Sequence, residues 1–301
     1  MSYPYLGDFV RVGLGVSVPL PIPMFGLFVA VAVVLAAHTF SLNIRRTEAL
    51  DRLPAGSHHA VYDLVTLTLL TGIVGARVFH ILEHLPEFVA DPASLIFSRG
   101  GFSIYGGLFF GVLAGMWFLR RRGLPVLSML DSAAPALLLG YAIGRIGCQV
   151  SGDGDWGISA DLALKPEWLP MWLWAQTYQG NIVGEVIPPP GVYPTPIYES
   201  LAALLMFSLL QGWAKRTRPP GSVFALYILS AGFERLLIEK IRINPRLDFL
   251  GLAFTQAELI SVCLILVGIG MLMVALRRAR RWLRLCIPLG LVVLLSACVA
   301  L

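Results

Sequence analysis

Charged residues are scarce in this chain. Only 14% of its 301 residues are Asp, Glu, Lys or Arg, whereas 57% are hydrophobic, and the mean hydropathy is +0.76. Because a soluble domain carries about 25% charged residues, this composition excludes an ordinary water-soluble fold. It indicates a protein that crosses a membrane several times.

Cysteine pairs and signal-peptide features are also missing. The four cysteines, Cys148, Cys263, Cys286 and Cys298, form no C-x-x-C motif, so we expect free thiols. The N-terminus has neither a basic region nor a small-residue cleavage site before the first apolar segment. We therefore expect that segment to be retained as a membrane span.

Apolar stretches near the ~20 residues needed to cross a bilayer recur along the chain. They predict an all-α polytopic membrane protein with seven core transmembrane helices and an eighth, shorter C-terminal helix. The expected spans are 21–41, 60–82, 101–119, 124–146, 196–213, 223–238, 259–276 and 285–301. We predict one membrane-embedded domain over residues 1–301, with 148–195 as a long loop and 285–301 as an additional span.

Basic residues are distributed unevenly among the connections. Four of these connections, around 45–52, 120–122, 215–218 and 277–284, hold 14 of the 23 Lys and Arg residues. The positive-inside rule places these four in the cytoplasm, and the N-terminus and the net acidic 148–195 loop outside. Topology and anionic lipid headgroups then explain most of the net charge of +5, so we expect no nucleic-acid partner.

Three arginines lie inside or at the edges of apolar spans, and the predicted topology brings all three to the outer leaflet. One such arginine could snorkel to the headgroups or pair with an acid. Three on one side, near aligned acids, favour bidentate recognition of a phosphate, and the simplest partner is a phospholipid headgroup. The set comprises Arg77, Arg145 and Arg235, with Tyr105 and Glu199 on the same side and Glu239 and Arg242 following Arg235 at helical spacing.

A glycine-rich stretch follows the fourth span. In "SGDGDWG", residues 151–157, five of seven residues are Gly or Asp, which predicts a tight turn with exposed backbone. We expect this turn to form a lip over an outer cavity.

Five motifs, in order over about residues 20–275, resemble those of the prolipoprotein diacylglyceryl transferases. They are "GARVFH" at 75–80, "RGGFSIYGGLFFG" at 99–111, "GRIG" with "GDGDWG" at 144–157, "YPTPIYE" at 193–199 and "RLLIEKIR" at 235–242. The resemblance implies an enzyme of the bacterial cytoplasmic (inner) membrane. It would transfer the diacylglyceryl group of phosphatidylglycerol to the lipobox cysteine of a prolipoprotein signal peptide, with the active site toward the outer leaflet and no cofactor or metal.

The resemblance also implies roles for individual residues. Arg145 and Arg235 would hold the phosphate, Glu239 would orient Arg235, and Tyr105 would stand near the thiol. The remaining substrate-binding residues would be Arg77, either Asp153 or Asp155 as the acid of the turn, Gly157, Glu199 and Arg242. The chain departs from the family at Cys148, where the family has asparagine, and at Phe25, where tyrosine is frequent.

Two other functions remain open on the sequence. "HILEH" at 80–84 fits H-x-x-E-H, an inverted zinc-peptidase pattern that requires a further ligand downstream. The same arginines could also serve a phospholipid-binding or transport protein. A chelator would separate the peptidase, and transport without a covalent product would separate the carrier.

Overall fold

The computed structural model of the chain describes residues 2–16, 20–96, 101–215, 219–249 and 252–299, and their side chains except at 246–249, 252 and 279–299. Arg99, which opens an expected motif, and residues 300–301 of the expected last span lie outside the described residues. The chain forms two compact units. Unit 1 comprises residues 1–36 and 130–301, and unit 2 comprises 37–129.

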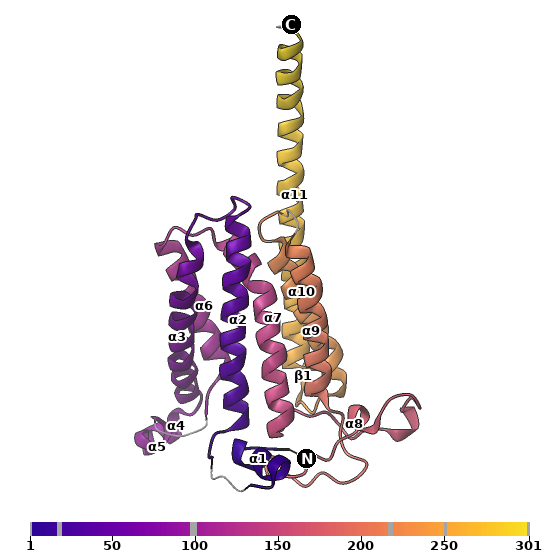
Figure 1. The fold of residues 1–301 in the computed structure, drawn as a ribbon. Coiled ribbons are helices and arrows are strands. Elements are labelled where there is room, and N and C mark those ends of the chain that lie inside the picture. The colour runs from indigo at the N-terminus through magenta and orange to yellow at the C-terminus, as the bar shows by residue number, and fades with distance from the viewer. Residues whose placement is uncertain (1, 17–19, 97–100, 216–218, 250–251, 300–301) are drawn as a thin grey trace. The chain divides into compact units, whose positions relative to one another are not determined.

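Helices dominate both units (Figure 1). The longer ones are α2 (Met24–Glu48), α3 (Ala60–Glu83), α6 (Ile104–Arg121), α7 (Val126–Ser151), α9 (Thr195–Ala214), α10 (Ser222–Ile238) and α11 (Gln256–Val299). The shorter ones are α1 (Leu6–Leu14), α4 (Leu85–Ala90), α5 (Pro92–Ile96) and α8 (Met171–Trp174), with 3₁₀ turns at Ser57–His59, Leu162–Leu164 and Glu239–Ile241. The prediction of a mostly helical fold is therefore confirmed.

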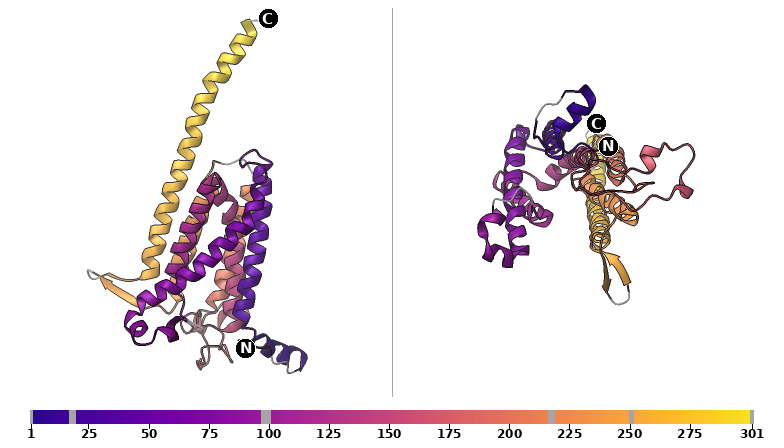
Figure 2. Two further views of the ribbon diagram at one scale, coloured as in Figure 1. Left: turned by 90° about the vertical axis from the view of Figure 1, so that its left-hand side faces the viewer. Right: turned by 90° about the horizontal axis from the view of Figure 1, so that it is seen from below.

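Among the described residues, one hairpin interrupts the helical pattern. Strands β1 (Arg246–Phe249) and β2 (Leu252–Thr255) pair antiparallel, with Arg246 opposite Thr255. Figure 2 shows the hairpin extending sideways from the helices of unit 1. This hairpin was not predicted, because strands of four residues are too short to show a recognisable alternation of apolar and polar residues.

Five of the described helices are long and apolar enough to cross a membrane. They cover Met24–Glu48, Ser57–Glu83, Val126–Ser151, Thr195–Ala214 and Gln256–Arg278. Two further expected spans correspond to α6 and α10, which have 18 and 17 residues. A polytopic helical membrane protein is therefore supported, while the count of seven core spans remains a prediction.

The C-terminal helix differs from the prediction. We expected separate spans at 259–276 and 285–301 with a basic connection between them, but α11 continues unbroken from Gln256 to Val299. Eight of the twelve residues 276–287 are arginine or leucine, which are good helix formers, and no glycine or proline lies among the twelve. The expected eighth span therefore continues the preceding helix.

A buried apolar cluster joins three helices of unit 1. The cluster comprises Ala134, Leu138 and Ala142 of α7, Ala203 and Leu210 of α9, and Val223 of α10.

The carboxylate of Asp131 accepts hydrogen bonds from the backbone N–H groups of Gly221 and Phe224, at 2.7 and 2.8 Å. It therefore satisfies two backbone N–H groups at the start of α10, which have no partner within the helix.

Glycines set the contact between α3 and α6 in unit 2. A Cβ added at Gly75 would lie 2.7 Å from the carbonyl oxygen of Gly106. The backbones of α3 and α6 can therefore come this close only because residue 75 has no side chain. A Cβ added at Gly107 or Gly111 would also meet α3 at van der Waals distance, and small residues four apart allow two helices to pack closely.

Candidate active site

Three arginines gather around one buried carboxylate in unit 1. Glu199, in the first turns of α9, is fully buried. Its carboxylate lies 2.8 Å from Nε of Arg145, 3.5 Å from Nη1 of Arg235 and 3.3 Å from Nη1 of Arg242. Since these arginines belong to the end of α7, the end of α10 and the segment after it, the cluster joins elements far apart in the sequence.

Asp155 is the second acid of this arginine cluster. Its carboxylate pairs with Arg145 and lies 2.5 Å from Nη2 of Arg242. Burial raises the pKa of Asp155, but the charges of Arg145 and Arg242 lower it by more, so the pKa falls below the ordinary value. The ion pairs thus stabilise the fold at neutral pH and are lost only as the pH falls through this lowered pKa.

The choice between the two candidate acids of the turn is decided by geometry. Asp153 accepts a hydrogen bond from the backbone N–H of Asp155 at 3.3 Å, whereas Asp155 reaches two arginines. Asp155 is therefore the acid that joins the arginine cluster, and Asp153 shapes the turn.

Helical spacing places the last pair of the cluster. Glu239 lies four residues after Arg235, and its carboxylate is 3.1 Å from Nη2 of that arginine, as predicted. Asn244 donates a hydrogen bond to the other oxygen of Glu239 at 2.7 Å. Because Glu239 is buried and held from two sides, it can fix the direction of the Arg235 guanidinium.

The glycine-rich turn is anchored to the start of α9 and to the segment after α10. Gly154 has φ of +96°, a conformation that favours glycine. Gly157 bridges to Arg242 and donates its N–H to the carbonyl of Tyr193 at 2.9 Å. A Cβ at Gly157 would lie 2.9 Å from Cγ2 of Thr195. The predicted turn is present and carries Asp155 to the arginines, but its backbone is not exposed as expected, since only Gly154 of residues 151–157 is exposed.

Two residues of the predicted site belong to unit 2. Nη1 of Arg77 donates to the carbonyls of Leu95 and Gly101, at 3.2 and 3.0 Å, and its guanidinium lies over the ring of Phe102. Tyr105 lies in the first turn of α6 and is 44% exposed. Arg77 thus organises the chain before α6, and the substrate roles of both residues remain predictions.

Cys148 lies next to the arginine cluster. It is buried, and its Sγ is 3.8 Å from Nη1 of Arg145. With Asp153 and Asp155 it forms one of two groups of described residues whose ligand atoms lie close enough to hold a metal ion. Because Asp155 is already paired with two arginines, a cation there would have to displace them.

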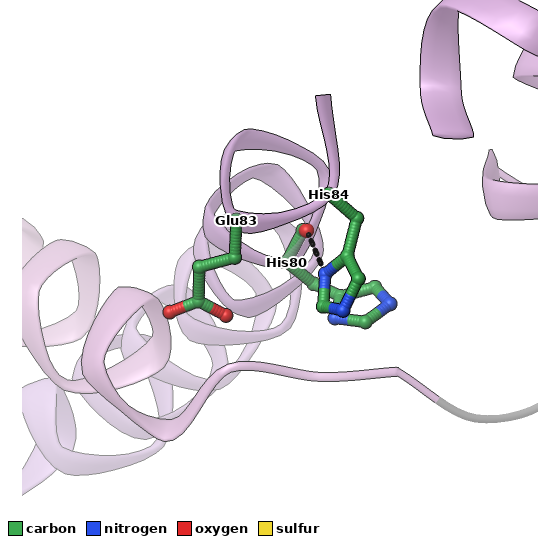
Figure 3. Close-up of side chains that lie close together, drawn as sticks. All are labelled: His80, Glu83 and His84. Atoms are coloured by element: carbon green, nitrogen blue, oxygen red, sulfur yellow. Dashed lines mark hydrogen bonds between the residues drawn. The ribbon is translucent and has the colours of Figure 1, made fainter. Parts of the chain in front are cut away.

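The other group with metal-ligand spacing is the "HILEH" motif at the end of α3. One ligand atom each of His80, Glu83 and His84 lies within 4.8 Å of the others. Figure 3 shows the two imidazoles together and the Glu83 carboxylate beside them. Nδ1 of His84 lies 3.0 Å from the carbonyl oxygen of His80, and Glu83 accepts a hydrogen bond from Ser103 at 2.9 Å. The further ligand that a zinc peptidase needs is not found among the described residues.

The aromatic residues of the long loop separate into two sets. Trp168 and Trp172 are exposed, as expected for residues that meet a membrane surface. Tyr178 of the same loop is instead buried, its ring centroid lies 5.0 Å from that of Trp156, and its hydroxyl donates a hydrogen bond to Gln149 at 2.7 Å. It therefore anchors the loop to α7.

Three residues near the cluster were not predicted. Asn244 holds Glu239, Tyr141 lies under the Arg145 guanidinium with 5.1 Å between the ring centroid and Cζ, and Glu234 lines a cavity beside Arg235. Tyr141 lies four residues before Arg145, a helical spacing that could have revealed it. Asn244 and Glu234 carried no such signal.

The fold and the site together define a multi-span helical membrane protein with an arginine cluster at the ends of its helices. Comparison with known proteins identifies the class more closely. The family model for prolipoprotein diacylglyceryl transferase matches residues 12–274, so the chain belongs to this family.

Individual relatives agree with this assignment. A protein of Azotobacter vinelandii is 31% identical over 288 residues, covering 93% of this chain and 98% of the relative. One of Leptospira interrogans is 31% identical over 252 residues, covering 68% and 76%. One of Pseudomonas paraeruginosa is 28% identical over 284 residues, covering 92% and 97%. All three are named phosphatidylglycerol–prolipoprotein diacylglyceryl transferase.

Proposed function

We propose that this protein transfers the diacylglyceryl group of phosphatidylglycerol to the cysteine thiol of a prolipoprotein lipobox and forms a thioether. The observation that carries the proposal is the gathering of Arg145, Arg235 and Arg242 around Glu199 and Asp155. Family membership favours this activity over a carrier or a zinc peptidase.

The arginines suit the chemistry of the leaving group. When the thiol sulfur attacks the glyceryl carbon, the C–O bond to phosphate breaks and glycerol phosphate leaves with additional negative charge. Guanidinium groups already fixed by carboxylates can stabilise that charge without reorganising. In our proposal Arg145 and Arg235 bind the phosphate, Glu239 orients Arg235, and Glu199, Asp155 and Arg242 hold them in place. Gly157 belongs to the same site in unit 1. For Arg77 and Tyr105, which belong to unit 2, we propose substrate-binding roles of their own.

A direct assay tests the proposal. Purified protein with phosphatidylglycerol and a lipobox peptide is expected to yield a peptide whose mass has increased by one diacylglyceryl group, detected by mass spectrometry. Since arginines neutralise the leaving group, we expect an added chelator to leave the rate unchanged. Cleavage of the peptide, or a rate that depends on added zinc, would contradict the proposal and favour a role for His80 and His84.

Reporter fusions test the proposed orientation, in which the N-terminus lies outside and the arginine cluster faces the outer leaflet. A fusion after Arg122 is expected to report the cytoplasm, because Arg120–Arg122 follow the positive-inside rule. A fusion near Trp156 is expected to report the outside. If Trp156 reports the cytoplasm, the cluster belongs to the inner leaflet and a substrate on the outer side is excluded.

A further inference from the structure

A cavity opens beside the arginine cluster within unit 1. It has a volume of about 200 Å³ and lies among α7, α9 and α10. Its walls include the apolar Leu138, Ala203 and Met206, and its polar groups include Tyr141, Glu234 and Arg235. The volume lies below the ~300–1,000 Å³ of pockets that enclose a whole drug-sized ligand. It suits a small part of a substrate, such as a thiol side chain with the glyceryl carbons.

Glu234 differs from every other carboxylate near this cavity. Asp155, Glu199 and Glu239 each pair with at least one arginine. Glu234 forms no ion pair among the described residues, and its buried Oε1 has no hydrogen-bond partner there. The oxygens of Glu199 and Glu239 that also lack a hydrogen bond lie 2.8 and 3.1 Å from arginine nitrogens. A carboxylate paired with arginine is a weak base, because the guanidinium stabilises its charged form. When carboxyl groups in one site have different environments, the difference separates their roles.

We propose that Glu234 is the base of the transfer reaction, an inference that rests on the proposed function above. Its carboxylate takes the proton from the S–H group of the lipobox cysteine. The sulfur electron pair then forms the S–C bond with the glyceryl carbon, and the electrons of the broken C–O bond leave with glycerol phosphate. The proton held by Glu234 finally passes to this phosphate, whose charge has increased, and the carboxylate is restored.

The position of Glu234 supports this assignment. Glu234 lines the same cavity as its neighbour Arg235, so proton removal and leaving-group stabilisation would occur side by side. The charged groups that act on Glu234 are Glu199 of α9, Arg145 of α7, Arg235 of its own helix and Arg242 after it, and the titratable Tyr141 and Tyr227 also line the cavity. The face of α11 that meets α10 around Gly232 presents Leu264 and Ile265, together with the Ser261 carbonyl.

The test is the pH dependence of Glu234→Gln, which preserves the shape of the side chain and removes the base. A thiol with the ordinary pKa of ~8.5 is about 3% ionised at pH 7 and about 75% ionised at pH 9. If the variant must wait for spontaneous ionisation, its rate should be about 30-fold below that of the natural protein at pH 7. At pH 9 the deficit should shrink to about twofold or less.

Two companion variants make the result specific. Arg145→Lys should lose activity by a factor that does not shrink with pH, since it affects the leaving group and not the thiol. The rate of Tyr105→Phe relative to that of the natural protein should not rise between pH 7 and pH 9. Thermal unfolding and binding of phosphatidylglycerol vesicles report whether Glu234→Gln is folded and holds its lipid.

Three outcomes would overturn the assignment: a Glu234→Gln rate equal to that of the natural protein at pH 7, a deficit of the same size at both pH values, or high-pH rescue in Tyr105→Phe alone. These outcomes leave the proposed transferase activity standing. If the natural protein itself forms no thioether product, the proposed function fails instead, so the two failures are distinguishable.

Discussion

Arg145→Ala is expected to lower diacylglyceryl transfer by at least about 100-fold. A charge-assisted hydrogen bond contributes about 1.5–3 kcal/mol, and a bidentate contact to a leaving phosphate contributes more in the transition state, where the charge develops. A factor of 100 in rate corresponds to about 2.7 kcal/mol. The measurement is the initial rate of thioether formation with phosphatidylglycerol and a lipobox peptide.

The structure adds a second expectation for this variant. Arg145 lies 2.8 Å from the fully buried Glu199 and also pairs with Asp155, so alanine removes a partner of a buried charge and should lower thermal stability. Arg145→Lys retains the charge and should remain folded while recovering only part of the activity, because an ammonium cannot form the planar fork. Arg122→Ala is the matched control, since its ion pair with Asp63 is exposed.

One result would contradict the phosphate-binding role of Arg145. Near-normal transfer by a well-folded Arg145→Ala protein would mean that the arginine serves only as a counter-charge for Glu199. The phosphate would then have to be bound by other residues.

Glu199→Gln is expected to have the largest effect on stability. Glu199 is the only described carboxylate that lies within 4 Å of all three arginines of the cluster. Without its charge, three guanidinium groups remain with Asp155 and Glu239, and breaking a buried ion pair costs about 3–5 kcal/mol. We therefore expect a clear fall in the unfolding temperature in detergent, with loss of transfer.

Asp63→Asn is the control for this prediction. Asp63 and Arg122 form a surface pair with side chains 61% and 56% exposed, and such pairs contribute about 0–1 kcal/mol. Its unfolding temperature should barely change. If Glu199→Gln unfolds no earlier than Asp63→Asn, the cluster does not depend on a central carboxylate and its arrangement needs another explanation.

Part of the candidate site could be predicted because its geometry is local. Arg235 and Glu239 are four residues apart on one helix, and that spacing alone brings their side chains together. Arg145 and Glu199 could be placed at the same membrane face because hydropathy locates span ends and basic loops orient them. The contact between their side chains depends on how α7 packs against α9, which the sequence does not show.

Other parts could not be predicted, because they depend on partners distant in the sequence. Asp153 and Asp155 occupy one glycine-rich turn, and only the contacts of that turn with Arg242 and Tyr193 select Asp155. Tyr178 is an aromatic residue of the kind that is frequent at membrane surfaces, yet the fold of the loop buries it against α7. Glu234 adjoins Arg235 in the sequence, but packing decides whether its side chain meets lipid or a cavity.

The sequence by itself determined that this is a helical membrane protein, which helix ends carry arginine and acid, and which family it belongs to. Hydropathy, helical spacing and motif order depend on residues close together in the chain, so they can be recognised without a fold. Only the tertiary structure decided that Glu199 is the centre of the arginine cluster, that Asp155 joins it, and that Glu234 stays outside the ion pairs. These pairings depend on how α7, α9 and α10 pack. Whether a charged group forms an ion pair is decided by its distance from opposite charges, and folding sets that distance.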